Sequence, residues 1–237
     1  MNYPERLAHN LAVVRRKMEA AAKQAGRAAS DVRLVAVTKG HPAEAIRALL
    51  DLGVTDIGES YLTEARAKQE ALVGQGGPAW HMIGHVQSRK AREVAQHFSI
   101  VHSLDSLKLA ERLHRFAQEA GQVLPVLLEC NVSGEISKQG WDCHADAGEF
   151  FADAQVIAGL PGLELRGVMS MAPITARLAE ARPYFERTRQ LRDTLAERLN
   201  MALPELSMGM SNDYEAAILE GATMVRIGEG LMGPRPK

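Results

Sequence analysis

Lys39 is the residue in this sequence whose type and position first suggest chemistry. It follows the strand-like run Val32–Thr38 and comes directly before Gly40, so it lies at the C-terminal end of a predicted buried strand. Desolvation at such a position disfavours the ammonium form and lowers the lysine pKa, which makes the amine a nucleophile toward aldehydes. The competing interpretation is a lysine that only marks where a strand meets solvent, and this segment alone does not decide between them.

Two glycine-containing segments near the C-terminus have the composition of a phosphate site. Residues 207–211 end in Ser211, just before Asn212 and Glu215, which have the spacing of a helix capping box. Residues 228–230, Gly-Glu-Gly, end the last apolar run. Glycines allow close backbone approach, the Ser211 hydroxyl adds a donor, and free backbone N–H groups attract phosphate. The alternative is a pair of tight turns without a ligand.

Arg226 is the third residue with chemical interest. It lies between Val225 and Ile227, so strand alternation predicts that it faces inward while its neighbours face the helices. An inward guanidinium stays charged and needs acceptors such as a pyridine nitrogen or phosphate oxygens. The structural alternative is a salt bridge to a carboxylate in the core.

The elements that must position these residues are strand-like runs that alternate with helical stretches. Their apolar, β-rich character is typical of parallel strands covered on both faces. The predicted strands are Val32–Lys39, Asp56–Ser60, Trp80–Gly84, Ile100–Asp105, Pro125–Val132, Leu165–Met171, Leu206–Ser211 and Met224–Gly230. An additional helix from about Pro4 to Ala25 precedes them, and the stretch Ser133–His144 is expected to be a long loop.

Eight alternating units predict an α/β fold, a (β/α)₈ TIM barrel with an extra N-terminal helix, in a single domain over residues 1–237. An open doubly wound sheet is the competing fold. Barrel proteins place their sites at the C-terminal ends of the strands, and closure makes the eighth strand a neighbour of the first. Lys39 would then lie beside the phosphate site. Pyridoxal 5'-phosphate, an aldehyde that carries a phosphate, fits this arrangement and would form a Schiff base with the lysine.

The composition of the chain and the spacing of its Cys and His residues argue against several other classes of protein and site. A net charge of -1 argues against a general nucleic-acid or membrane-surface binder. Cys130 and Cys143 have no metal-ligand spacing, and no apolar run reaches membrane-spanning length, so we expect a cytoplasmic protein without a metal site. His81 and His85 would lie about 13 Å apart along a strand, too far to share a metal, and are expected to form hydrogen bonds.

Motifs along almost the whole chain resemble those of the YggS/PROSC family of pyridoxal phosphate homeostasis proteins. The matching segments are residues 35–39 (Val-Ala-Val-Thr-Lys), 57–61 (Ile-Gly-Glu-Ser-Tyr), 80–84 (Trp-His-Met-Ile-Gly), 86–88 (Val-Gln-Ser) with Lys90, 131–133 (Asn-Val-Ser) with Ser137, Lys138 and Gly140, 166–169 (Arg-Gly-Val-Met), 206–211 (Leu-Ser-Met-Gly-Met-Ser) and 224–228 (Met-Val-Arg-Ile-Gly). The last two are the most specific.

The resemblance implies a barrel like the N-terminal domain of alanine racemase, with pyridoxal phosphate bound as a Schiff base on Lys39. It implies phosphate contacts from Ser211 and the backbone of Gly228 and Glu229, and a cofactor contact from Arg226. Ser60 and His81 complete the predicted cofactor-binding residues. It also implies a monomer that takes part in vitamin B6 homeostasis without catalytic residues or substrate turnover. Whether apo-enzymes that depend on pyridoxal phosphate receive the cofactor from it stays open.

Departures from the family pattern at four positions accompany these matches. The family usually has Asn at the position of Ser60, Pro and Asn at those of His85 and Arg89, and often Thr at that of Glu229. A shorter side chain near the cofactor and an anionic one near the phosphate put the affinity in question. The alternative function is an amino-acid racemase that depends on pyridoxal phosphate, and a third is a Schiff-base aldolase without a cofactor, for which Arg226 would have no purpose.

Overall fold

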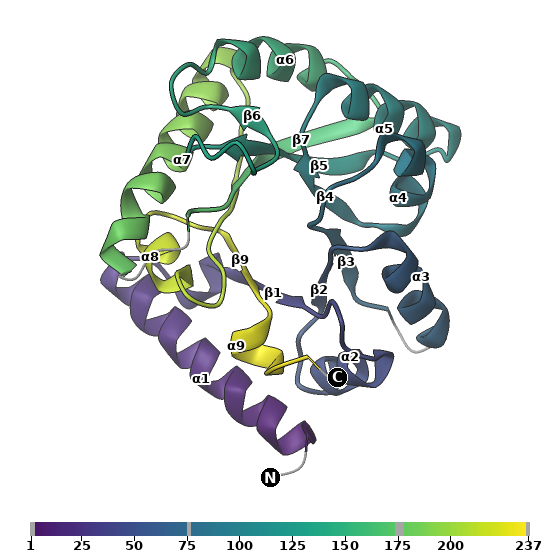
Figure 1. The fold of residues 1–237 in the computed structure, drawn as a ribbon, viewed down its shortest axis with the longest axis vertical. Coiled ribbons are helices and arrows are strands. Elements are labelled where there is room, and N and C mark those ends of the chain that lie inside the picture. Colours follow the sequence, from purple (N-terminus) through teal and green to yellow (C-terminus); the bar gives the residue numbers. More distant parts are fainter. Residues whose placement is uncertain (1–2, 75–76, 174–177, 236–237) are drawn as a thin grey trace.

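Eight parallel strands form a closed barrel at the centre of the protein. The structure is a computed structural model that describes residues 3–74, 77–173 and 178–235. The barrel strands are β1 (Arg33–Val37), β2 (Asp56–Glu59), β3 (Ala79–Met82), β4 (Ile100–Leu104), β5 (Leu124–Asn131), β7 (Leu163–Ser170), β8 (Glu205–Ser207) and β9 (Met224–Ile227). Each pairs with its neighbours in that order, and the pairings β1–β9 and β4–β5 complete the ring (Figure 1). The predicted TIM barrel is therefore confirmed.

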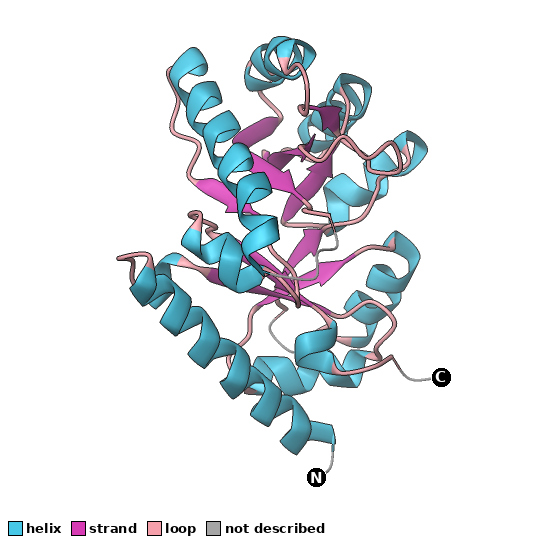
Figure 2. Cartoon of the chain, turned by 60° about the vertical axis from the view of Figure 1, so that its left-hand side comes forward, coloured by secondary structure: helices cyan, strands magenta, loops and turns pink. Residues whose placement is uncertain are grey.

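Helices surround the barrel in the order of a (β/α)₈ fold (Figures 1 and 2). They are α1 (Tyr3–Gln24), α2 (Ala43–Asp51), α3 (Leu62–Ala71), α4 (Ala91–His97), α5 (Leu107–Glu119), α6 (Gly148–Ala158), α7 (Leu178–Leu199), α8 (Tyr214–Leu219) and α9 (Glu229–Met232). Short 3₁₀ turns, Ala29–Asp31 and Ser88–Lys90, precede β1 and α4. The extra helix α1 packs against α8 and α9. Among the described residues, no helix has the length and apolar composition of a membrane span.

The core has two parts. Between strands and helices lies a large apolar cluster that includes Ile57, Phe150 and Phe185, each fully buried. Inside the barrel a smaller apolar cluster contains Val35, Ile100, Leu127, Met169 and Met224. The rest of the interior is polar, so burial leaves the inward side chains with hydrogen bonds to satisfy.

Apart from strands that end earlier than predicted and α9, which begins within the predicted strand Met224–Gly230, the structure differs from the predicted elements at two places. Asn212 does not cap a helix, because α8 begins at Tyr214 and the Asp213 carboxylate instead accepts the Met210 N–H at 2.5 Å. The segment predicted as a loop after the fifth strand contains β6 (Trp141–Asp142), which pairs with the end of β5. Both differences involve short segments whose tertiary contacts override the local pattern.

Candidate functional site

A cavity of about 520 Å³ opens at the C-terminal end of the barrel, where the sequence predicts the site. Six of the seven predicted site residues line it: Lys39, Ser60, Ser211, Arg226, Gly228 and Glu229. They come from β1, β2, β8 and β9 and the segments that follow these strands. His81 is the exception, because it is not among the lining residues. Ile83, Met171, Pro173 and Met210 supply apolar walls.

Lys39 is half-buried at the edge of this cavity. Burial lowers the pKa of its amine, as do the positive charges of Arg235 and Arg226, while Glu59 and Glu64 oppose the shift. Within the described part of the chain its amine has no hydrogen-bond or ion-pair partner. The structure thus gives Lys39 the properties of a nucleophilic amine: access, partial desolvation and a larger neutral fraction than a free lysine has.

A buried cluster on the helix side of the barrel fixes the backbone next to Lys39. The Lys68 ammonium of α3 donates to the Thr38 carbonyl at 2.7 Å and to the carboxylates of Glu59 and Glu64, each at 2.6 Å. The Glu64 carboxylate also accepts the Gly40 N–H at 2.6 Å. All three Lys68 donors are therefore used on groups that flank Lys39. The sequence analysis missed Lys68, because only the packing of α3 against β1 and β2 gives it this role.

Arg226 lines the cavity and is only 4% exposed. Its guanidinium donates to Ser207 Oγ at 2.6 Å and to the Ser170 carbonyl at 3.0 Å. Burial lowers its pKa to about 10, with partial compensation from Glu129 and Asp213. No carboxylate of the described residues forms an ion pair with it. Two of its five N–H groups have acceptors, so three are without an acceptor among the described residues.

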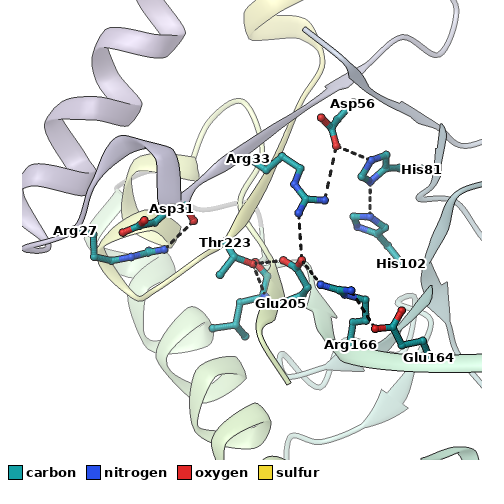
Figure 3. A network of polar contacts seen from close by, with 11 residues as sticks. Arg27, Asp31, Arg33, Asp56, His81, His102, Glu164, Arg166, Glu205 and Thr223 are labelled. Carbon is teal, nitrogen blue, oxygen red and sulfur yellow. Dashed lines mark hydrogen bonds and ion pairs between the residues drawn. The ribbon is translucent and has the colours of Figure 1, made fainter. Parts of the chain in front are cut away.

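A hydrogen-bond chain continues from Arg226 through the barrel interior to Asp56. Ser207 Oγ lies 2.8 Å from His102 Nδ1, His102 Nε2 lies 2.9 Å from His81 Nδ1, and His81 Nε2 lies 3.0 Å from Asp56 Oδ1. Figure 3 shows Asp56, His81 and His102 in line. Arg226 can only donate and the Asp56 carboxylate can only accept. Both ends are satisfied when Ser207 donates to His102, His102 to His81 and His81 to Asp56.

This chain explains the position of His81. Burial holds the pKa of His102 well below its ordinary value. The nearby His81, Arg226 and Arg33 lower this pKa further. At the N-terminal end of the barrel Arg33 lies 3.8 Å from Asp56 and 3.3 Å from Glu205, which anchors the chain (Figure 3). His81 is therefore linked to the cavity-lining Arg226 through His102 and Ser207, and its direct contact with a cofactor has no support in this geometry.

The predicted phosphate site is a group of hydrogen-bond donors between β8 and α9. The N–H groups of Gly228 and Glu229 have no acceptor among the described residues. The Ser211 hydroxyl accepts the Gly230 N–H at 3.1 Å, which ties the two loops together. Gly209 has a φ of +91°, and a Cβ there would lie 2.6 Å from the Ala217 side chain, so the turn requires glycine. The Glu229 side chain is exposed.

Comparisons with known proteins match nearly the whole chain. The model of the family described as alanine racemase, N-terminal domain, matches residues 4–236. The pyridoxal phosphate homeostasis protein of Pseudomonas aeruginosa is 45% identical over 230 residues, which are 97% of this chain and 96% of that protein. The protein of the same name from Escherichia coli K12 is 41% identical and covers 97% of each chain.

Solved structures agree with these relatives. PipY of Synechococcus elongatus, in its structure with PLP bound, is 36% identical to this chain. The match has a TM-score of 0.83 and covers 96% of this chain and all of the PipY chain. The same protein without PLP gives a TM-score of 0.86. On its sequence and its fold, this chain belongs to the family of pyridoxal phosphate homeostasis proteins, within the wider group that shares the alanine racemase N-terminal domain.

Proposed function

We propose that this protein binds pyridoxal 5'-phosphate reversibly, as a Schiff base on Lys39, and takes part in vitamin B6 homeostasis without turning over a substrate. The observation that carries the proposal is one cavity that holds an amine with a lowered pKa, a buried guanidinium and unpaired backbone N–H groups. The names of the relatives and the PLP-bound PipY structure support it.

The residues present fit this cofactor. A volume of about 520 Å³ falls within the usual range of small-molecule sites. The N–H groups of Gly228 and Glu229 and the Ser211 hydroxyl would hold the phosphate, and the apolar walls would cover the ring. When bound, the cofactor supplies an aldehyde that condenses with the Lys39 amine. Ser60 would lie near the ring, where its short side chain reaches less far than an asparagine does.

The position of Arg226 favours binding of the cofactor over catalysis on a substrate. Because its free N–H groups only donate, it would meet the pyridine nitrogen in its unprotonated form, which weakens the ring as an electron sink. The Ser207–His102–His81–Asp56 chain fixes Arg226 in this donor role. A racemase needs a second proton-transfer group across the ring, and among the described residues that line the cavity Lys39 is the one amine or imidazole base.

An absorbance spectrum tests the cofactor and its attachment. We expect the wild type, incubated with pyridoxal phosphate, to develop the visible band of a protonated Schiff base. Lys39→Ala should lose it, whereas Lys108→Ala, on the exposed face of α5, should keep it. After borohydride reduction, peptide mass analysis should find the modification on Lys39. A protein that never develops the band, or a modified peptide without Lys39, would contradict the proposal.

A separate assay tests the absence of turnover. The loaded protein is incubated with single amino acids and the products are analysed by chiral chromatography. We expect no racemization or transamination beyond the rate of free pyridoxal phosphate. Sustained turnover that Lys39→Ala removes would favour the racemase-type alternative. The single-domain organisation, the monomeric state, the cytoplasmic location and delivery to apo-enzymes stay predictions.

A further inference from the structure

A second cavity of about 310 Å³ adjoins the cofactor cavity at Lys39. The two share Val37, Lys39, Gly228 and Glu229 in their linings. The second cavity is completed by His41, Gly233, Pro234 and Arg235, none of which lines the first. Lys39 therefore borders both spaces. A molecule in the second cavity would lie next to the atom that we propose as the attachment point of the cofactor.

Arg235 places a positive charge at this second cavity, and its side chain is exposed. Its side chain crosses the backbone at Gly40, where a Cβ would lie 2.9 Å from Arg235 Cδ. Gly40 also has a φ of +77°, so the turn after Lys39 and the room for this arginine both depend on glycine. Of all charged groups, Arg235 has the largest effect on the Lys39 amine. No residue in the described ranges forms a hydrogen bond or ion pair with the Arg235 guanidinium.

The nearby carboxylates do not neutralise Arg235. Glu59 and Glu64 are both held by Lys68 at 2.6 Å. Glu229 lines both cavities, but it is exposed and forms no ion pair with Arg235 among the described residues. His41 is 6% exposed, and its Nδ1 is buried without a partner. Burial, with the charges of Lys68 and Arg235, lowers the pKa of His41. This shift favours the neutral imidazole in the lining of the second cavity.

An unpaired guanidinium beside a reactive amine selects for a particular ligand. The planar guanidinium binds a carboxylate through two parallel hydrogen bonds, an arrangement stronger than that of a single neutral pair. A ligand that can also react beside Lys39 must carry a primary amine near its carboxylate. Free α-amino acids combine the two groups on one carbon, and a cavity of about 310 Å³ has room for a small one.

We infer that the second cavity binds the carboxylate of a free α-amino acid through Arg235 and brings its amine to the position of Lys39. This rests on the proposed function and extends it, because it gives the held cofactor a route of release. In the exchange, the former aldehyde carbon forms a bond to the incoming nitrogen and its bond to Lys39 Nζ breaks. The incoming ammonium loses two protons as its nitrogen becomes the protonated imine nitrogen, and Nζ gains two as it leaves as an ammonium, so atoms and charge balance.

The first test compares two amines that differ in their carboxylate. Protein loaded with pyridoxal phosphate is mixed with L-alanine or L-alaninamide over a range of pH, and loss of protein-bound cofactor is followed after gel filtration. Rates are compared at equal concentration of the neutral amine, because the two amines differ in basicity. We expect the wild type to prefer alanine by about tenfold, the scale of one charge-assisted contact. The preference should vanish in Arg235→Gln, be partly kept in Arg235→Lys and be unchanged in Arg16→Gln, a control on the exposed face of α1.

The preference ratio is the decisive quantity, because Arg235→Gln also changes the Lys39 pKa and with it the absolute rates. Equal rates for both amines in the wild type, or a preference that survives Arg235→Gln, would overturn the inference. A second test uses the cofactor-free protein, in which L-alanine should shift the amide NMR signals of Gly40 and Gly233 and L-alaninamide should not. Failure to load pyridoxal phosphate would contradict the proposed function alone, and the NMR test would still decide on the carboxylate site.

Discussion

At the scale of single residues, the site depends on charges that are left unpaired. Lys39, Arg226 and Arg235 all lie around the two cavities, and each lacks a carboxylate partner among the described residues. Of the carboxyl groups, Glu129 compensates the charge of Arg226 most, and it is itself 4% exposed. Burial raises the pKa of Glu129 to about 7, with a further rise from Asp105, while Arg226 and His85 lower it. The buried acid beside Arg226 therefore has a pKa close to neutral pH.

Glu129 makes the stability of the protein depend on pH. A carboxyl group with a higher pKa in the folded state binds its proton more tightly there, so its contribution to stability is present below about 4.5 and is lost as the pH rises to about 7. We expect the free energy of unfolding of the wild type, relative to Glu129→Gln, to fall by about 3 kcal/mol between pH 4.5 and pH 8. Urea unfolding of the cofactor-free proteins at several pH values measures this difference. Parallel curves for the two proteins would show that Glu129 keeps an ordinary pKa.

At the scale of elements, five strands share one hydrogen-bond chain. Asp56, His81, His102, Ser207 and Arg226 come from β2, β3, β4, β8 and β9 in that order. Each strand contributes one polar side chain to the barrel interior, where the chain satisfies donors that would otherwise be buried without partners. The orientation of Arg226 thus depends in part on β3 and β4, none of whose residues line the cavity.

Removal of the Ser207 hydroxyl tests this dependence. Ser207→Ala leaves an Arg226 N–H and His102 Nδ1 without partners in the interior. We expect a loss of about 2–3 kcal/mol in the free energy of unfolding, since one of the lost hydrogen bonds involves a charged donor. The absorbance maximum of bound pyridoxal phosphate should also shift, because Arg226 then loses its fixed orientation. Ser30→Ala, at an exposed position, is the control. A destabilised protein with an unchanged spectrum would mean that the chain serves stability alone.

The sequence predicts local features well and the contacts between distant strands poorly. All eight strand segments, α1, and the positions of Lys39, Arg226 and Ser211 follow from alternation, apolar runs and motifs, which are short-range properties. The roles of His102 and Lys68 do not, because they depend on which strand or helix lies opposite in the closed barrel. His81 is the instructive case. Its motif marks it as important, but only the register of β3 and β4 shows that it acts through His102.

At the scale of the whole molecule, α1 closes the outside of the barrel near the phosphate site. Its buried face includes Leu7 and Leu11, and it packs against α8 and α9. α9 begins directly after Gly228, so the N–H groups that would bind phosphate lie at the start of this four-residue helix. The Asn10 side chain donates to the Leu231 carbonyl at 2.9 Å and joins the two helices. The first helix of the chain thus supports a loop near its last residues.

Asn10→Ala should therefore weaken cofactor binding from a distance. Loss of its hydrogen bond to α9 is expected to cost about 1 kcal/mol of folding stability. If α9 positions the Gly228 and Glu229 N–H groups, the dissociation constant of pyridoxal phosphate should rise about fivefold. This factor corresponds to a loss of about 1 kcal/mol of binding free energy. Absorbance titration measures the affinity and urea unfolding the stability. His9→Ala, one position away and exposed, should change neither. A stability loss with unchanged affinity would show that α1 holds the barrel together without influence on the phosphate site.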